Sequence, residues 1–208
     1  MSVEEEEYKG CTIKIEYDTD PMDPRKEFHT LGTIFALCHN RTLSDDDAED
    51  PREWTWKESE AHISLPVYMY DHSGVLLSTT PFSCPWDSGQ VGRIYVSKEK
   101  VRKEYGWKRL SEARVDNIKE CLRQEIKVLS DYMSGSVYGH IVEAEDGDVI
   151  DSCWGYYGDE EIEYMLLQGR KVIDYYLERE AEDRVAEFVT SYNLPTALVA
   201  MVNHRRAG

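Results

Sequence analysis

The stretch ISLPVYMYDHSGVLLST, residues 63–79, decides how the fold is interpreted. Two runs rich in β-branched and aromatic residues, 63–70 and 75–79, flank the turn-forming residues 71–74, and this is the pattern of a β-hairpin. Pro66 has no backbone N–H, so it predicts that the first strand lies at a sheet edge or contains a bulge. A hairpin here favours an antiparallel sheet over alternating βαβ units.

Further strand patterns occur on both sides of this hairpin. Alternation of apolar and polar residues predicts a strand over 11–17, and apolar runs predict strands over 33–39 and 91–96. A second hairpin is predicted from strands 137–144 and 149–154, because they flank an Asp-Gly turn pair. The chain therefore has enough hairpin strands to build an antiparallel sheet.

Helical patterns follow the first group of strands. Ser97 and Gly106 are typical of residues that start and end a short helix. Between Ser111 and about Met133, apolar residues recur at spacings of three or four, which predicts an amphipathic helix that Gly135 stops.

The C-terminal part of the chain predicts two more helices, at about 159–179 and 181–192. Strands first and helices later indicate an α+β fold, in which an antiparallel sheet built from hairpins packs against two or three helices from the C-terminal half. We expect one domain over residues 11–194, with an acidic tail at 1–10 and a C-terminal tail at 195–208.

The negative charge is large and uneven. The chain has 208 residues and a formal net charge of −17. Residues 1–60 (17 acids, 7 bases) and 146–208 (13 acids, 6 bases) carry most of it, while residues 61–110 (4 acids, 7 bases) are slightly basic. This charge argues against direct nucleic-acid binding and against attraction to anionic lipid. It fits either solvated acidic faces or a surface that binds a basic protein.

Several classes of site lack support in the sequence. The histidines have no metal-binding spacing and no glycine-rich nucleotide motif is present, so we expect neither a metal nor a cofactor. The five cysteines have no CxxC pair, which favours free thiols in a reducing compartment. No apolar run approaches the ~18 residues of a membrane span. With an acidic start unlike a signal peptide, these features predict a cytoplasmic protein.

The most unusual segment is TPFSCPWDSGQVG, residues 80–92, which we interpret as a structured loop. Cys84 is a candidate nucleophile, because His72 on the nearby hairpin turn and Asp87 in the loop are the base and acid that such a thiol needs. No established nucleophile motif surrounds it. The alternative is that Cys84 only packs in the loop.

Acidic clusters and two tryptophans are the candidates for partner contact. The clusters lie in the loop around residues 45–50 and at the start of the helix after residue 158; the tryptophans lie in the two segments of unusual composition. Core packing is the alternative for Trp154, and anchoring of its loop is the alternative for Trp86. The candidate residues are Asp45, Asp46, Asp47, Glu49, Asp50, Trp86, Trp154, Asp159, Glu160, Glu161 and Glu163.

Three blocks, LPVYMYDHSG (65–74), PFSCPWDSGQVG (81–92) and DSCWGYYG (151–158), resemble an uncharacterised family of small bacteriophage and mobile-element proteins. The resemblance covers roughly residues 11–165 and brings no catalytic residues with it. It implies an accessory protein that acts inside a bacterial host cell.

Three functions remain open from these features. The resemblance to mobile-element proteins and the negative charge favour an inhibitor of a host defence complex, of the anti-CRISPR or anti-restriction type. The carboxylates of such an inhibitor imitate the phosphates of nucleic acid. A protein-interaction or assembly module without mimicry is the first alternative. A thiol-dependent enzyme centred on Cys84 and His72 is the second. None of these features determines the oligomeric state.

Overall fold

The computed structural model describes residues 2–36, 43–72, 74–84 and 86–191. The chain forms two compact units. Unit 1 comprises Met1–Tyr17, Tyr138–Trp154 and Glu160–Gly208; unit 2 comprises Asp18–Val137 and Gly155–Asp159. The expected C-terminal tail, 195–208, lies outside the described residues.

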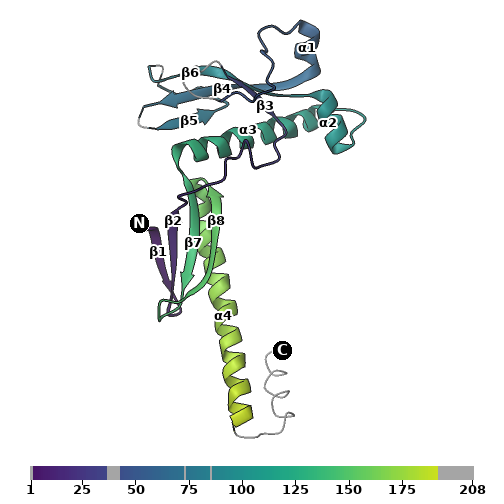
Figure 1. Ribbon diagram of the computed structural model, residues 1–208. Coiled ribbons are helices and arrows are strands. Elements are labelled where there is room, and N and C mark those ends of the chain that lie inside the picture. The colour runs from purple at the N-terminus through teal and green to yellow at the C-terminus, as the bar shows by residue number, and fades with distance from the viewer. Residues whose placement is uncertain (1, 37–42, 73, 85, 192–208) are drawn as a thin grey trace. The chain divides into compact units, whose positions relative to one another are not determined.

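Unit 1 is a four-stranded sheet with one long helix along it (Figure 1). The strands are β1 (Ser2–Tyr8), β2 (Cys11–Tyr17), β7 (Val137–Glu143) and β8 (Val149–Tyr157), in the order β1-β2-β7-β8. The first residue of β7 and the last three of β8 are grouped with unit 2. The helix is α4 (Ile162–Ser191).

The expected acidic tail forms strand β1 and pairs with β2 in an antiparallel hairpin. Lys9 and Gly10 connect the two strands, with positive φ angles of 52° and 85°. Positive φ at both turn residues is typical of a tight hairpin turn. The sequence pattern does not predict this strand, because it contains four consecutive glutamates and glutamate has a low β-propensity.

Helix α4 packs closely on strand β2. Ile13 and Ile15 point to the helix and are fully buried, as are Met165 and Ile173 of α4. Gly169 lies directly over Ile13, and a Cβ atom there would come within 2.8 Å of the Ile13 side chain. The glycine therefore permits the close approach of helix and sheet.

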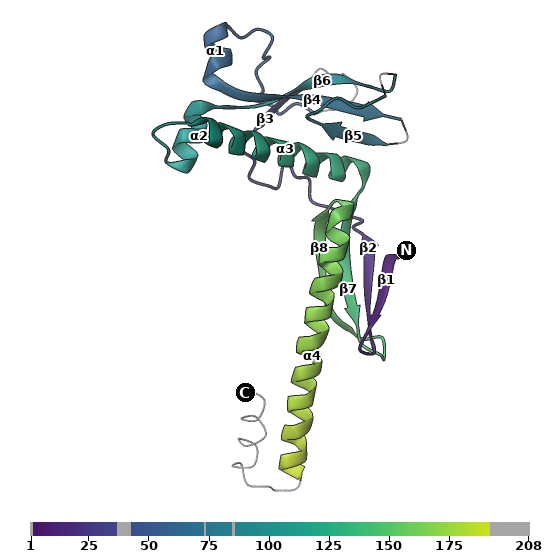
Figure 2. The same ribbon diagram turned by 180° about the vertical axis from the view of Figure 1, so that it is seen from behind.

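Helix α4 is one continuous helix, so our prediction of two helices in this region was wrong. A short 3-10 turn, Asp159–Glu161, precedes it. No glycine or proline separates residues 179 and 181, so nothing in the chain interrupts the helix there. None of the residues from Asp174 to Ser191 is buried, and the C-terminal end of α4 extends beyond the strands of unit 1 (Figure 2).

Unit 2 contains a second four-stranded antiparallel sheet, with strand order β3-β6-β4-β5. Helix α3 (Glu112–Ser134) lies across one face of this sheet (Figure 1). The strands are β3 (Thr33–Ala36), β4 (His62–Asp71), β5 (Val75–Ser78) and β6 (Ser88–Ser97). The α+β class and the two predicted hairpins are confirmed, although the strands form two sheets.

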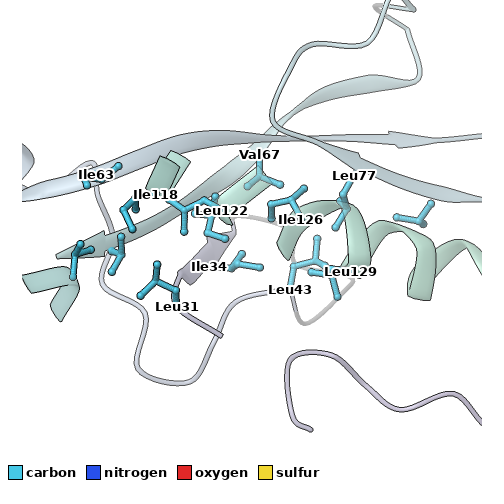
Figure 3. Packing of buried hydrophobic residues seen from close by; sticks show 14 residues of the cluster. Leu31, Ile34, Leu43, Ile63, Val67, Leu77, Ile118, Leu122, Ile126 and Leu129 are labelled. Carbon is cyan, nitrogen blue, oxygen red and sulfur yellow. The ribbon is translucent and has the colours of Figure 1, made fainter. Parts of the chain in front are cut away.

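The core of unit 2 lies between α3 and the sheet (Figure 3). The predicted apolar stripe is confirmed, because Ile118, Leu122, Ile126 and Leu129 are all buried in this core. Ser111 and Gly135 cap α3 as expected, and Ser97 and Gly106 cap α2 (Lys98–Tyr105). From the sheet, Ile34, Ile63, Val67, Leu77 and Ile94 contribute to the same core.

Pro66 sits in a strand that is not at the edge of its sheet. Among the described strands, β6 alone pairs with β4 at Pro66, because β5 pairs with β4 from Tyr68 onward. A register shift follows immediately, between Val67 and Tyr68. The predicted bulge is thus present beside the proline.

Two features of unit 2 differ from the sequence interpretation. Strand β6 begins at Ser88, so the last residues of the expected loop 80–92 pair with β4. A short helix, α1 (Trp56–Ala61), was not predicted. Thr55 and Glu58 form a reciprocal capping box at its start, a signal that the sequence does carry.

Candidate functional site

The structure brings together the three residues proposed for thiol chemistry. Cys84 Sγ lies 3.6 Å from Asp87 Oδ2, and the same oxygen lies 3.6 Å from His72 Nδ1. The loop is held to the hairpin by a bond from the Asp71 backbone N–H to the Asp87 carbonyl, at 3.0 Å. The side chains of His72 and Asp87 are exposed by 65% and 40%, so the cluster lies at the surface.

The order of these groups does not suit nucleophilic catalysis. An activated cysteine needs the imidazole against its sulfur and the carboxylate behind the imidazole. Here the Asp87 carboxylate lies between Cys84 and His72, so it contacts the thiol itself. The cluster therefore favours a structural role for Asp87 in holding the loop.

The acidic loop around residue 45 is partly used inside unit 2. The guanidinium of Arg25 is largely buried and binds the carboxylates of both Asp45 and Glu125. Asp45 also accepts a 2.7 Å bond from the Ile34 backbone N–H, and Glu125 accepts one of 2.7 Å from the Leu31 N–H. Asp45 thus helps to fix the start of β3 and is not directed at a partner.

Asp50 also has an internal partner. The Arg52 guanidinium binds its carboxylate, and this hydrogen bond holds the pKa of Asp50 below its usual range. Asp46, Asp47 and Glu49 are exposed, so they are the residues of this loop that stay accessible for partner contact.

The acidic residues after Gly158 form the 3-10 turn and the first turn of α4. Asp159, Glu160 and Glu163 are exposed, and Glu161 is half-buried. Carboxylates at a helix N-terminus complement the helix dipole, which gives these residues a structural role as well.

The two tryptophans differ in their surroundings. Trp86 is 91% exposed, so it does not anchor its loop by packing. Trp154 is 44% exposed, and its ring covers Gly139, where a Cβ atom would come within 2.2 Å of ring atom Cε3. Trp154 therefore packs on the backbone of the sheet and leaves its outer side accessible.

The net negative charge is concentrated in unit 1. Its 83 residues contain 19 acids and 8 bases, a net charge of −11, whereas the 125 residues of unit 2 contain 22 acids and 16 bases, a net charge of −6. Some carboxylates of unit 1 are paired: Arg170 binds Glu6 at 2.5 Å and Lys9 binds Asp174 at 2.6 Å. These bonds lower the pKa of Glu6 and of Asp174.

Among the described residues, several other carboxylates of unit 1 face solvent and form no salt bridge, although Lys14 lies near Glu5 and Arg179 lies near Glu182 and Asp183. On strand β1 these are Glu4 and Glu5; on α4 they include Glu178, Glu182 and Asp183. The acidic residues at the start of α4 are candidates from the sequence, whereas those in its C-terminal half are not, although a helix was predicted there as well.

Unit 2 has a groove that the sequence did not indicate. It encloses about 440 Å³ beside the sheet face opposite α3, and its lining includes Phe35, Trp54, Arg52 and Arg93. Arg52 lies over the ring of Phe35 with its guanidinium carbon 5.8 Å from the ring centre. Residues from four separate segments build this groove, so no local motif could reveal it.

Within the described part of the chain, no three His, Cys, Asp or Glu residues are grouped as a metal site. No helix among the described residues is both long and apolar enough to cross a membrane. Comparison with models of known protein families gives no match, and comparisons with curated proteins and with solved structures give none either.

Proposed function

We propose that this chain is an accessory protein whose unit 1 binds the basic surface of a nucleic-acid-binding protein and inhibits it by occupying that surface. The observation that carries the proposal is the net charge of −11 on the 83 residues of unit 1. A host defence complex of the CRISPR or restriction type is the target that the resemblance to mobile-element proteins favours. Opposite charge would speed the encounter and set the orientation of the partners.

The C-terminal half of α4 supports this proposal. Glu178 and Glu182 are spaced four residues apart, as are Asp183 and Glu187, and all four side chains are exposed. Like charges at this spacing weaken a helix by about 0.2–0.5 kcal/mol per pair. A cationic partner would relieve this repulsion, so the helix gains stability on binding.

A second candidate function is an interaction module that does not use mimicry. The 91% exposure of Trp86 favours it, because a protruding indole is a common centre of protein interfaces. Such an interface would depend on apolar contact and would resist salt.

A pull-down from a bacterial lysate separates the two candidates. The full chain is immobilised at about 50 mM salt, and bound proteins are eluted by a gradient to about 500 mM. The proposal expects a nucleic-acid-binding protein that elutes within this gradient and that duplex DNA displaces from the chain. A partner that stays bound at high salt and is not displaced by duplex DNA would contradict mimicry and favour the Trp86 interface.

Two matched variants locate the surface. Changing Glu178, Glu182, Asp183 and Glu187 to glutamine removes four charges from α4 of unit 1. Changing Asp46→Asn, Asp47→Asn, Glu49→Gln and Glu53→Gln removes four exposed charges from unit 2. The first variant should lose the partner, and the second should keep it.

A further inference from the structure

Unit 1 contains a groove between strand β8 and helix α4. It encloses about 670 Å³ and is lined by Ile150 and Asp151 of the strand and by one face of the helix. The helix residues are Gln168, Lys171, Val172, Tyr175, Tyr176 and Arg179. Helix α4 packs on β1 and β2, where Gly169 lies on Ile13 and Arg170 binds Glu6. Because of this placement, the helix does not cover β8, and the groove remains between them.

In the part of the chain that the structure describes, β8 is an edge strand of its sheet, so one row of its backbone N–H and C=O groups faces no other strand. Most of its side chains are exposed, including Val149 at 61%. The opposite edge, β1, carries exposed Glu4 and Glu5, and charged side chains of this kind protect an edge from pairing. Edge β8 is therefore the edge that is open to an added strand.

The basic residues of unit 1 show which chemistry the groove accepts. Lys9, Lys14, Arg170 and Arg184 each pair with a carboxylate. Among the described residues of this unit, the remaining two cations, Lys171 and Arg179, form no ion pair with a carboxylate, and both line the groove. Arg179 donates a 3.5 Å hydrogen bond to the Tyr175 hydroxyl, and the carboxylates of Asp183 and Glu182 act on it electrostatically. The groove is thus a cationic site in an acidic unit.

We propose that this groove binds an extended, acidic peptide segment of a partner protein, which adds to edge β8 as a strand and places its carboxylates on Lys171 and Arg179. Peptides that add to a sheet edge gain affinity from main-chain hydrogen bonds and specificity from side-chain pockets. Acidic residues of unit 1 that lie more than ~8 Å from the groove oppose this binding only weakly, because charges at that distance are screened at physiological salt. The one carboxylate in the lining, Asp151, lies 3.9 Å from His140.

The dimensions of the groove define the peptide. Lys171 and Arg179 are eight residues apart on one helix, a separation of about 12 Å. Side chains on one face of a strand repeat every two residues, at about 6.8 Å, so glutamates four positions apart are about 13.6 Å apart. The matching peptide therefore has two acidic residues at positions i and i+4. This proposal concerns a different surface from the acidic one above and goes beyond the inhibitor function.

Fluorescence anisotropy with a labelled peptide tests the proposal. The probe is an eight-residue peptide of alternating valine and threonine with two glutamates four positions apart; its control has lysine at both acidic positions. We expect the acidic peptide to bind the full chain and the lysine peptide to bind at least tenfold more weakly. Equal binding of both peptides, or no binding of the acidic one at millimolar protein, would overturn the proposal.

Variants and hydrogen exchange then test the location. The double variant Lys171→Gln with Arg179→Gln should weaken binding about tenfold or more, whereas Arg184→Gln, a cation on the same helix outside the groove, should not. Bound peptide should slow exchange of the β8 amides and leave those of β1 unchanged. Slowed exchange at β1, or unchanged affinity in the double variant with its circular dichroism intact, would contradict the assignment.

Discussion

The two units have similar sheets but use their charged residues differently. In unit 2, acidic side chains such as Asp45 and Glu125 converge on the buried guanidinium of Arg25 and fix the chain around β3. In unit 1, the C-terminal half of α4 presents Glu178, Glu182, Asp183 and Glu187 to solvent, and no residue of this half is buried. The comparison teaches that acidic residues of the same type serve the fold in one unit and remain available for binding in the other.

The core of unit 2 allows the strongest test of the division into units. Leu122 is fully buried under the sheet, so Leu122→Ala should destabilise unit 2 by about 2–5 kcal/mol. Native-state hydrogen exchange should show faster exchange in α3 and β6, with the amides of β2 and β7 unaffected. Equal loss of protection in both sheets would show that the units unfold together.

The buried cation of unit 2 gives the next largest effect. Arg25→Gln leaves the carboxylates of Asp45 and Glu125 close together without their positive partner. Removing one partner of a buried ion pair costs about 3–5 kcal/mol, and the partial exposure here places the expected loss near ~3 kcal/mol. Urea unfolding measures it. The exposed pair offers a control, because Arg52→Gln should cost under ~1 kcal/mol.

The contact between α4 and β2 tests unit 1 in the same way. Gly169→Val forces side-chain atoms against Ile13 and should destabilise unit 1 by about 1–3 kcal/mol. The Cβ position of Gly89 is open, so Gly89→Ala serves as the control and should change stability little. If Gly169→Val left exchange of the β2 amides unchanged, the close packing of helix and sheet would be refuted.

Acid should weaken unit 1 more than unit 2 between pH 7 and pH 5. Burial lowers the pKa of His140, although Asp151 opposes this effect, so the folded state disfavours the imidazolium. The unfolded state then binds more protons below the ordinary value of 6.5, and stability falls as the pH drops. We expect unit 1 to lose stability over this pH range, measured by protection of the β7 amides. His140→Gln should remove this pH dependence; its persistence in that variant would assign it to other groups.

The smallest expected effect concerns Cys84. Because Asp87 rather than His72 contacts its sulfur, we expect alkylation of Cys84 at pH 7 to be no faster than that of exposed Cys153. Mass spectrometry of peptides labelled with iodoacetamide measures both rates. Labelling of Cys84 at least tenfold faster, lost in His72→Ala, would restore the thiol-dependent enzyme as a candidate function.

Local patterns predicted most elements but not their assembly. The stripe of α3, the caps at Ser97 and Gly135, and both hairpins follow from residue spacing and turn chemistry, which act over a few residues. The division into two sheets follows from pairing between distant strands, such as β2 with β7, which no local pattern specifies. Strand β1 was missed because glutamate is a poor strand former, and its pairing with β2 overrides that preference.

The candidate sites likewise depend on contacts between distant segments, which local sequence patterns do not predict. The sequence identified the acidic clusters and the Cys84, His72 and Asp87 group, and the structure does bring those three residues together. It could not reveal that Asp45 binds Arg25, which is 20 residues away in the chain. Nor could it reveal the groove of β8 and α4, because Lys171 and Arg179 meet Ile150 only through the packing of α4.

The most direct test of the central claim is the salt dependence of partner binding for the two four-charge variants. The dissociation constant of the captured partner is measured from about 50 to 500 mM salt for the unaltered chain, for the α4 variant of unit 1 and for the loop variant of unit 2. We expect a steep salt dependence that the α4 substitutions flatten and the loop substitutions leave unchanged. A salt dependence equal in all three proteins would contradict the assignment of binding to the acidic surface of unit 1.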